Sequence, residues 1–330
     1  MRRVMSITVL AVAVATVLLL PGAWSTAGFA QAYPSKPIKL IVPFPAGGVP
    51  DIVGRVIARG LSEQLGQSVI VDNRAGAAGT VGVEAAAKSL GDGYTLVLGT
   101  TGTLASAPSL YPNLGYDPVN SFTPVSLLIS APFLIVVHPS VPANSLSELV
   151  DFAKSRPGQL NFGSVGNGSP PHIAGEVFKI AAGVDLVHVP YKALPTAVTD
   201  LLTGRIHLMF NQLAPFQSHL QAGKLRALAV AAPGRVSQLP SVPTAAESGL
   251  PGYEVSIWFG LLVPRGTPTD VVTKLNAEVL KALSTKQVHD SLAAQGFEPG
   301  GSSSEQFSAL IVSETAKWSR AIKASGAKLD

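Results

Sequence analysis

Three short segments of this 330-residue sequence are rich in glycine, serine and threonine, and each follows a predicted strand. They are residues 44–48 (FPAGG), 99–103 (GTTGT) and 163–169 (GSVGNGS). Glycine lets a ligand come close to backbone N–H groups, and the N-terminus of a following helix favours negative charge. A single glycine corner more often serves only to permit a tight turn between strand and helix. Three such corners together favour a binding site for an anion.

The third of these corners leads directly into a predicted helix. Ser169 precedes Pro170, and proline is favoured at the first position of a helix, so we predict that Ser169 is the N-cap. Free amides of the first turn would then face the ligand. His172 lies in that turn and would either donate to a ligand or pack on the loop as a surface histidine. Asp51, in the first turn after Pro50, is expected to complement the helix dipole.

Motifs for catalysis and for metal or cofactor binding are incomplete. Ser164 lacks the glycine two positions before it that a G-x-S-x-G nucleophile elbow needs, which makes it a weak nucleophile. The spacing of Gly76, Gly79 and Gly82 is not that of a dinucleotide-binding turn. The six histidines form no H-E-x-x-H motif, and the chain has no cysteine. We therefore predict no enzyme activity, no cofactor and no metal site.

The N-terminus has the pattern of a secretory signal peptide. Arg2 and Arg3 precede an uncharged stretch over residues 4–20, and the small residues at positions 30–32 form a cleavage site. A retained membrane anchor is the alternative, because 17 uncharged residues come close to the roughly 20 that span a bilayer. The pattern favours cleavage after residue 32, following general or twin-arginine export. We therefore predict a periplasmic protein.

The composition of the whole chain gives no support to two classes of partner. Its formal net charge is +4, and charged residues make up 13% of it. Such a weak excess without clusters argues against binding to nucleic acid or to an anionic membrane. Residues 33–330, which follow the predicted cleavage site, are enough for two domains of ordinary size.

The hydrophobic pattern alternates between strand and helix. Residues 38–42, 68–71 and 94–98 are predicted strands, residues 81–89 are a predicted helix, and a second series follows. That series has strands over residues 134–137, 160–163, 186–189 and 206–210, and helices over residues 147–155 and 196–202 and from Pro170. The order predicts parallel sheets in an α/β fold with two similar halves.

The last part of the sequence is predicted to be mostly helical. One helix starts at Thr269, and Ser302 with Glu305 matches a capping box for another. Such a tail would return to the first half and pack on it. We predict two lobes joined by two crossing strands. After a signal peptide at residues 1–32, lobe 1 comprises residues 33–131 and 257–330, and lobe 2 comprises residues 132–256.

Motifs along the whole chain beyond residue 32 resemble one family. The segments LIVPFPAGGVPD, LNFGSVGNGSPPHIAGE, VDLVHVPYK and WFGLLVPRGTP, in this order, are similar to the Bug family of periplasmic solute-binding proteins. These proteins serve tripartite tricarboxylate transporters. The resemblance implies a type II-like Venus-flytrap fold that captures a small carboxylate between its lobes and delivers it to a membrane permease. We expect a monomer.

The positions of this sequence that match the family's ligand-binding motifs are the candidate ligand-binding residues. They are Pro45, Ala46, Gly47, Gly48, Thr100, Thr101, Gly102, Thr103, Ser164, Gly166, Gly168, Ser169, His172, Tyr191 and Asn211. Ala193 stands where the family usually has glycine, and Asn211 stands where it has aspartate. Neutral Asn211 removes a charged partner for an ammonium group, which favours a carboxylate without an amino group. A secreted α/β hydrolase and a soluble ligand-sensing protein remain the alternatives.

Overall fold

The computed structural model describes residues 33–326. The chain divides into two units, Met1–Ser35 and Lys36–Asp330, and the helices and strands of the described part all belong to the second. The predicted signal peptide lies outside the described residues. Among residues 33–326, no helix is both long and apolar enough to cross a membrane.

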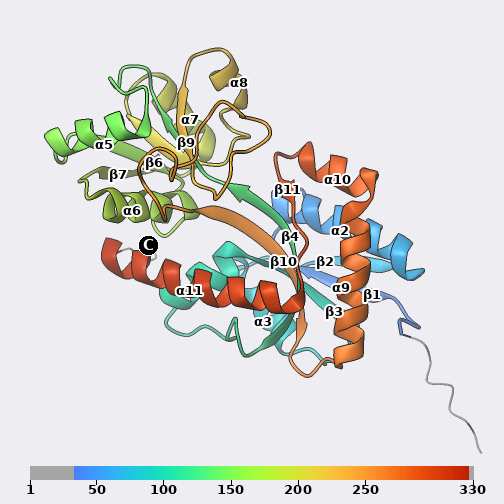
Figure 1. Cartoon of the computed structure of the whole chain (residues 1–330). Coiled ribbons are helices and arrows are strands. Elements are labelled where there is room, and N and C mark those ends of the chain that lie inside the picture. The colour runs from blue at the N-terminus through green and yellow to red at the C-terminus, as the bar shows by residue number, and fades with distance from the viewer. Residues whose placement is uncertain (1–32, 327–330) are drawn as a thin grey trace, which may run out of the picture. The chain divides into compact units, whose positions relative to one another are not determined.

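The first sheet is mixed and has six strands in the order β11-β4-β10-β3-β1-β2 (Figure 1). Their bounds are Ile38–Val42 (β1), Val69–Asn73 (β2), Thr95–Thr100 (β3), Phe122–Pro132 (β4), Ser256–Pro264 (β10) and Glu298–Pro299 (β11). β1 pairs in parallel with β2 and β3, as the alternating pattern predicted, whereas β10 pairs antiparallel with β3 and β4. Leu40, Ile41 and Val42 are all buried, which is typical of a parallel strand covered on both faces.

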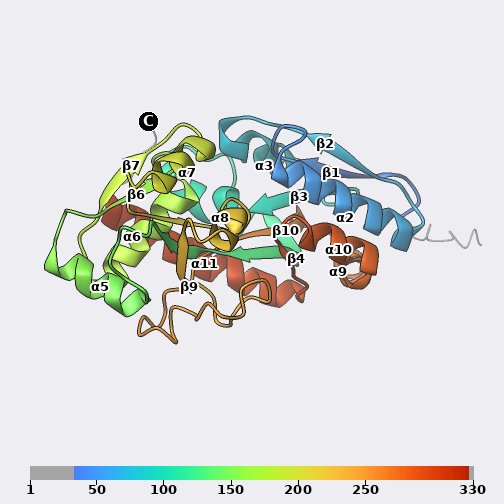
Figure 2. The same ribbon diagram turned by 90° about the horizontal axis from the view of Figure 1, so that it is seen from above.

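Helices cover both faces of the first sheet. They are Val49–Leu65 (α2), Thr80–Ala87 (α3), Ala107–Leu110 (α4), Thr269–Ser284 (α9), Lys286–Ala293 (α10) and Ser304–Ser325 (α11), with a 3₁₀ turn at Ala77–Gly79 (η1) and a π-helical turn at Gly102–Ser106 (η2). Seen from above, α2 and α11 lie on opposite sides of the sheet (Figure 2).

The start of α11 corrects one prediction. The capping box is formed by Ser303 and Gln306, not by Ser302 and Glu305. Ser302 is held outside the helix because its hydroxyl accepts a hydrogen bond from the backbone N–H of Leu127 in β4, at 3.0 Å. The helix therefore begins one residue later than the sequence pattern indicated.

The second sheet has five strands in the order β7-β6-β8-β5-β9. Their bounds are Leu134–Val137 (β5), Asn161–Ser164 (β6), Val187–Pro190 (β7), Leu208–Asn211 (β8) and Arg226–Val230 (β9). β6 pairs in parallel with β7 and β8, and β5 pairs antiparallel with β8 and β9. The helices of this part are Leu146–Ser155 (α5), Pro170–Ala182 (α6), Leu194–Leu202 (α7) and Gln217–Gln221 (α8).

Two long strands connect the sheets. β4 and β10 pair antiparallel along their length, from Pro132 opposite Ser256 to Phe122 opposite Pro264. β4 leads directly into β5 of the second sheet, and the N–H of Phe133 donates to the carbonyl of Val255 at 2.9 Å. The predicted two-lobed α/β fold with two crossing strands is confirmed. The exact lobe boundaries at residues 131, 132, 256 and 257 stay predictions.

Helix α11 is tied to the crossing strand β10 by a buried carboxylate. Glu314 of α11 accepts hydrogen bonds from the indole N–H groups of Trp258 in β10, at 3.2 Å, and of Trp318, at 3.0 Å. The backbone N–H of Trp258 donates to the hydroxyl of Thr101, at 2.7 Å. Helix, crossing strand and the end of β3 are thus joined by buried hydrogen bonds.

Candidate ligand-binding site

Loops and strands from both sheets border an open cavity of about 380 Å³, here called the first cavity. Its lining consists of Phe44, Pro50, Ala78, Thr100, Thr101, Gly102, Phe133, Val165, Pro170, Pro171, Leu194, Asn211, Gln212, Ile257 and Phe259. The cavity lies beyond the carboxyl ends of β3, β6 and β8, where ligands bind in open α/β sheets.

The lining of the first cavity is mostly apolar and carries no charged side chain among the described residues. Its polar side chains come from Thr100, Thr101, Asn211 and Gln212. Asn211 is 3% exposed, and its side-chain oxygen accepts from the N–H of Gln212 at 2.9 Å. This bond orients the amide, so that its NH₂ group is the donor left for a ligand oxygen.

A second cavity of about 280 Å³ adjoins the first and shares Ala78, Gly102 and Pro170 with it. Its other lining residues are Ser106, Ala107, Leu110, Tyr111, Asn167, Gly168 and Ser169. Gly102 borders both cavities, and because it has no side chain only its backbone lines them. A Cβ atom added there would meet only Thr100 Oγ1, at 3.6 Å, an ordinary contact.

The loop after β3, residues 100–106, is held by its own hydroxyl groups and is called the first loop. The N–H of Thr100 donates to Thr103 Oγ1 at 3.0 Å, and the N–H of Thr103 donates to Thr100 Oγ1 at 3.2 Å. The hydroxyl of Thr101 bonds the backbone of Trp258. Thr101 and Thr103, which are among the candidate ligand-binding residues, therefore use their hydroxyls within the protein. The loop continues as a π-helical turn, a form often found at functional sites.

The loop after β6, residues 164–169, is called the second loop and is held by different groups. Ser164 Oγ lies 2.6 Å from His188 Nε2 and also accepts from the N–H of Gly166 at 3.1 Å. The N–H of Gly168 donates to His172 Nδ1 at 3.0 Å. Ser164 is fully buried and lines neither cavity, so its histidine contact supports the loop and does not make an accessible nucleophile.

Ser169 is the N-cap residue of α6, as predicted, but its side chain caps no amide and donates instead to the carbonyl of Gly166 at 2.7 Å. The expectation of free amides in the first turn of this helix is wrong. The first two positions of the helix are Pro170 and Pro171, which have no N–H group. The first turn therefore presents far fewer free amides than we predicted.

His172 is a buried residue and not a surface histidine. It is 5% exposed and stacks on His188, with ring centroids 3.8 Å apart. Burial, with a smaller contribution from the charge of Lys179, lowers the pKa of His172 to about 4. Its Nδ1 atom accepts from the second loop, so His172 shapes the loop. Direct contact between His172 and a ligand stays a prediction.

The corner after β1 is exposed and lies outside the lining of both cavities. It consists of four of the predicted site residues, Pro45, Ala46, Gly47 and Gly48. The N–H of Gly47 donates to Asp51 Oδ2 at 2.8 Å. Burial raises the pKa of Asp51, but hydrogen bonds from Arg55, Gly47 and Asn73 outweigh it and leave the pKa below its usual value. Asp51 thus holds the corner, while Phe44 and Pro50 on either side line the first cavity.

Tyr191 also lies outside both linings. Its hydroxyl donates to Asp200 Oδ2 at 2.8 Å, and burial together with this bond raises its pKa to about 12. Ligand contact by Tyr191 and by the corner at residues 45–48 stays a prediction. Thr100, Thr101, Gly102 and Asn211, in contrast, come together in the first cavity.

Sequence reasoning missed Ala78, which lines both cavities. Ala77 and Ala78 have φ values of 43° and 52°, a left-handed conformation that is uncommon for alanine and is found preferentially at functional sites. Phe133, Ile257 and Phe259 of the crossing segments were missed as well. The signal for these three was the predicted crossing itself, since a crossing strand must border the space between the lobes.

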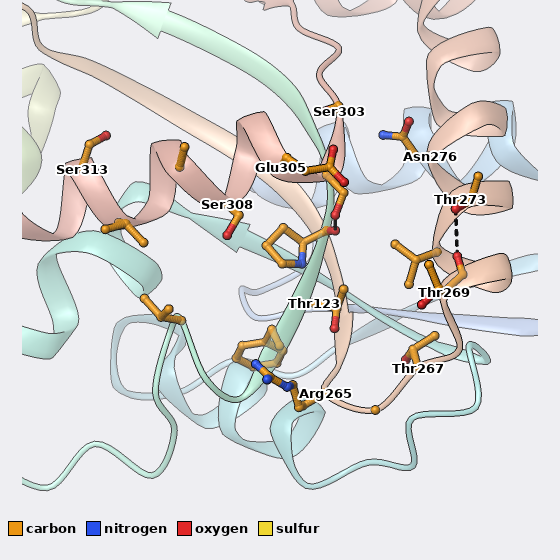
Figure 3. A pocket seen from close by; sticks show the side chains of 18 residues that line it. Thr123, Arg265, Thr267, Thr269, Thr273, Asn276, Ser303, Glu305, Ser308 and Ser313 are labelled. Atoms are coloured by element: carbon orange, nitrogen blue, oxygen red, sulfur yellow. Dashed lines mark hydrogen bonds between the residues drawn. The ribbon is translucent and has the colours of Figure 1, made fainter.

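A larger hollow of about 1110 Å³ lies between α9 and α11 (Figure 3). Thr269 and Thr273 of α9 line it, together with Ser308 of α11 and Arg265 after β10. Because β10 runs antiparallel to β3, the end of β10 lies near the start of β3. The hollow is therefore at the opposite end of the sheet from the carboxyl ends, and no element of the second sheet contributes to its lining.

Comparisons with known proteins agree over most of the chain. A family model described as tripartite tricarboxylate transporter family receptor matches residues 53–327. Protein BugT of Bordetella pertussis is 38% identical over 301 residues, which cover 91% of this chain and 92% of that protein.

Two solved structures are also similar. R. palustris Rpa4515 with adipate is 39% identical with a TM-score of 0.72, covering 90% of this chain and 100% of that chain. MatC (Rpa3494) from Rhodopseudomonas palustris with bound malate is 34% identical with a TM-score of 0.69, covering 88% of this chain and 100% of that chain. Adipate and malate are both small dicarboxylates.

Proposed function

Because the chain belongs to the tripartite tricarboxylate transporter receptor family, we propose that it captures a small organic acid in the first cavity and delivers it to the permease of such a transporter. The observation that carries this proposal is a cavity bordered by loops of both sheets, whose polar groups are uncharged. The adipate and malate bound by its relatives support an acid as the ligand.

The lining indicates how the acid is held. A carboxylate oxygen accepts from the amide of Asn211, and the bare backbone of Gly102 allows a ligand to approach closely. Phe44, Phe133 and Phe259 provide apolar contacts for the carbon chain of the acid. An ammonium group would find no carboxylate in the described lining. We therefore propose an acid without an amino group.

The receptor acts outside the cytoplasm as a monomer without catalytic activity. Removal of residues 1–32 as a signal peptide would release a periplasmic protein that starts at Tyr33. Capture and release of an unmodified acid need no nucleophile, in keeping with the buried position of Ser164.

The test is thermal unfolding of the chain from residue 33 with adipate, succinate, malate and aspartate. We expect at least one acid without an amino group to stabilise the protein, by about 2.7 kcal/mol at a hundredfold excess over its dissociation constant. Asn211→Asp should weaken this response through like-charge repulsion. Asn113→Asp adds the same charge at an exposed position outside both cavities and should not. Stabilisation by aspartate alone would contradict the proposal.

A further inference from the structure

Apolar side chains provide most of the surface that a ligand can touch in the first cavity. Phe44, Leu194 and Ile257 are half-buried, and Val165 is 36% exposed, so each keeps accessible area. Phe44 follows β1 and Ile257 lies in β10, whereas Val165 follows β6 and Leu194 begins α7. A ligand between the two sheets therefore meets apolar side chains on both sides, and these four residues are called the apolar walls.

The donors of the same lining lie more deeply and are few. Thr100 and Thr101 are 4% and 1% exposed, and their hydroxyls bond within the protein. Asn211 differs, because its oxygen accepts from the N–H of Gln212 while its Nδ2 atom donates to no described residue. Among the described residues, only Ser106 has a side-chain polar atom that is both buried and unpaired, so Asn211 Nδ2 keeps accessible area. This donor is open to the first cavity that Asn211 lines.

The amides of the lining are gathered at one point. Asn211 is the last residue of β8, and the half-buried Gln212 follows it and lines the same cavity. The two oxygen atoms of one carboxylate can accept from these neighbouring amides. The end of β8 therefore offers a place for a single acidic group.

A second carboxylate finds no comparable place. The described lining of the first cavity contains no lysine, arginine or histidine, and taking a carboxylate out of water without a partner costs free energy. The far end of a dicarboxylate must therefore keep its water or stay outside, and in both cases it loses contact with the apolar walls. An apolar far end gains free energy from the same contact.

Resting on the proposed function, we propose that the ligand is a monocarboxylate with an apolar body, in contrast to the dicarboxylates adipate and malate of the two relatives. Its carboxylate binds the amides at the end of β8. Its body lies between Phe44 and Ile257 on one side and Val165 and Leu194 on the other. The apolar walls thus determine specificity for the part of the acid that carries no charge.

The test compares butanoate, hexanoate and adipate by isothermal titration calorimetry on the chain from residue 33. We expect hexanoate to bind roughly tenfold more tightly than butanoate, the effect of two more buried methylene groups. Hexanoate should also bind about tenfold more tightly than adipate, although both have six carbons, because the second carboxylate of adipate keeps its end from the apolar walls. The heat-capacity change of binding should be more negative for hexanoate than for butanoate.

A charge placed in the apolar walls should reverse this preference. Val165→Lys supplies the cation that the lining lacks, so adipate should bind this variant about tenfold more tightly than wild type, and hexanoate should bind it more weakly. The matched control is Val187→Lys, because Val187 of β7 is 47% exposed and lies outside both cavities. The control should bind both acids as wild type does. Both valines are exposed, and thermal unfolding without ligand verifies that both variants fold.

The outcomes distinguish this inference from the proposed function. If adipate binds wild type more tightly than hexanoate, or if hexanoate gains nothing over butanoate, the apolar monocarboxylate is overturned while the receptor for acids stands. If adipate binds Val165→Lys no more tightly than Val187→Lys, the far end of the acid does not lie at the apolar walls, and the inference is overturned. If none of the three acids binds wild type, the proposed function fails, and the inference fails with it.

Discussion

The first loop and the second loop both follow a strand that ends at the site, and both are built from glycine, serine and threonine, yet they contribute differently. The first loop pairs Thr100 with Thr103 and brings the bare backbone of Gly102 to both cavities. The second loop depends on His172 and presents the apolar Val165 to the first cavity, next to the two prolines that begin α6. Composition therefore indicates where a ligand loop lies, whereas the use of its donors is decided by tertiary contacts.

The largest expected effect concerns the histidine that holds the second loop. Burial lowers the pKa of His172 to about 4, whereas an unfolded histidine titrates near 6.5, so the unfolded state takes up a proton first as the pH falls. The contribution of His172 to the free energy of unfolding should be complete above pH 6.5 and fall by roughly 3 kcal/mol between about pH 6.5 and 4. His188, which stacks on it and whose pKa burial also lowers to about 4, adds to the fall in the same window. Urea unfolding across this range measures it.

Substitution of His172 tests whether this residue causes the pH dependence of the free energy of unfolding. His172→Gln should show a smaller fall over the same pH window, because the titrating group is gone. His289→Gln, at an exposed position on α10, should keep the pH dependence of wild type. Equal pH dependence in wild type and His172→Gln would show that the second loop does not rely on a neutral imidazole.

The next effect tests the first loop. The test uses an acid that stabilises wild type. Gly102→Val should raise the dissociation constant for this acid about a hundredfold, because the valine side chain enters the space where the two cavities meet. Its stability should change little, since Gly102 does not have a positive φ and its surroundings leave room for a Cβ. Gly234→Val, in an open and exposed position, is the control. If Gly102→Val binds the acid as tightly as wild type does, the first loop is not part of the binding site.

A smaller loss is expected where the first loop meets the crossing strand. Thr101→Val keeps the shape of the side chain but leaves the N–H of Trp258 without its acceptor, which should cost about 1.5 kcal/mol in the free energy of unfolding. Thr273→Val removes an exposed hydroxyl on α9 and should cost much less. Chemical denaturation of the two variants measures the difference, and equal losses would contradict the role assigned to Thr101.

The smallest effect returns to the second loop. Ser169→Ala should reduce the free energy of unfolding by only about 0.5 kcal/mol, because its hydroxyl makes one partly exposed bond and caps no amide. Ser303→Ala removes the true cap of α11 and should cost about 1 kcal/mol. A larger loss for Ser169→Ala than for Ser303→Ala in the same denaturation experiment would show that the Ser169 hydroxyl caps α6 in solution.

Local patterns were enough to predict much of the fold. The bounds of β1 and β5 match the predicted strands to the residue. β5 is a continuous apolar run, typical of a strand buried on both faces, and β1 is apolar apart from the exposed Lys39. Strand β4 was missed, since Pro124 interrupts its pattern and proline argues against a central strand. Its partner β10 lies more than 100 residues away, and no local signal records such a pairing.

Where the site residues lie was easier to predict than how they are used. Thr100 was named because it follows a predicted strand and Asn211 because of the family resemblance, and both line the first cavity at the carboxyl ends of strands. Their contact with a ligand stays a prediction. The bond between Gly168 and His172 could not be derived, because the azimuth of a residue in the first turn is poorly set by helical period alone. The left-handed Ala78 was hidden because alanine gives no signal for that conformation.

The carboxylate of Glu314 has a spectroscopic consequence. The chain contains three tryptophans, of which Trp24 lies in the predicted signal peptide and Trp258 and Trp318 both donate to Glu314. Fluorescence of the chain from residue 33 therefore arises from a single pair of indoles around one acid. Since the backbone of Trp258 is bonded to Thr101 of the first loop, a ligand that shifts this loop should change the emission, and the protein carries its own optical reporter of occupancy.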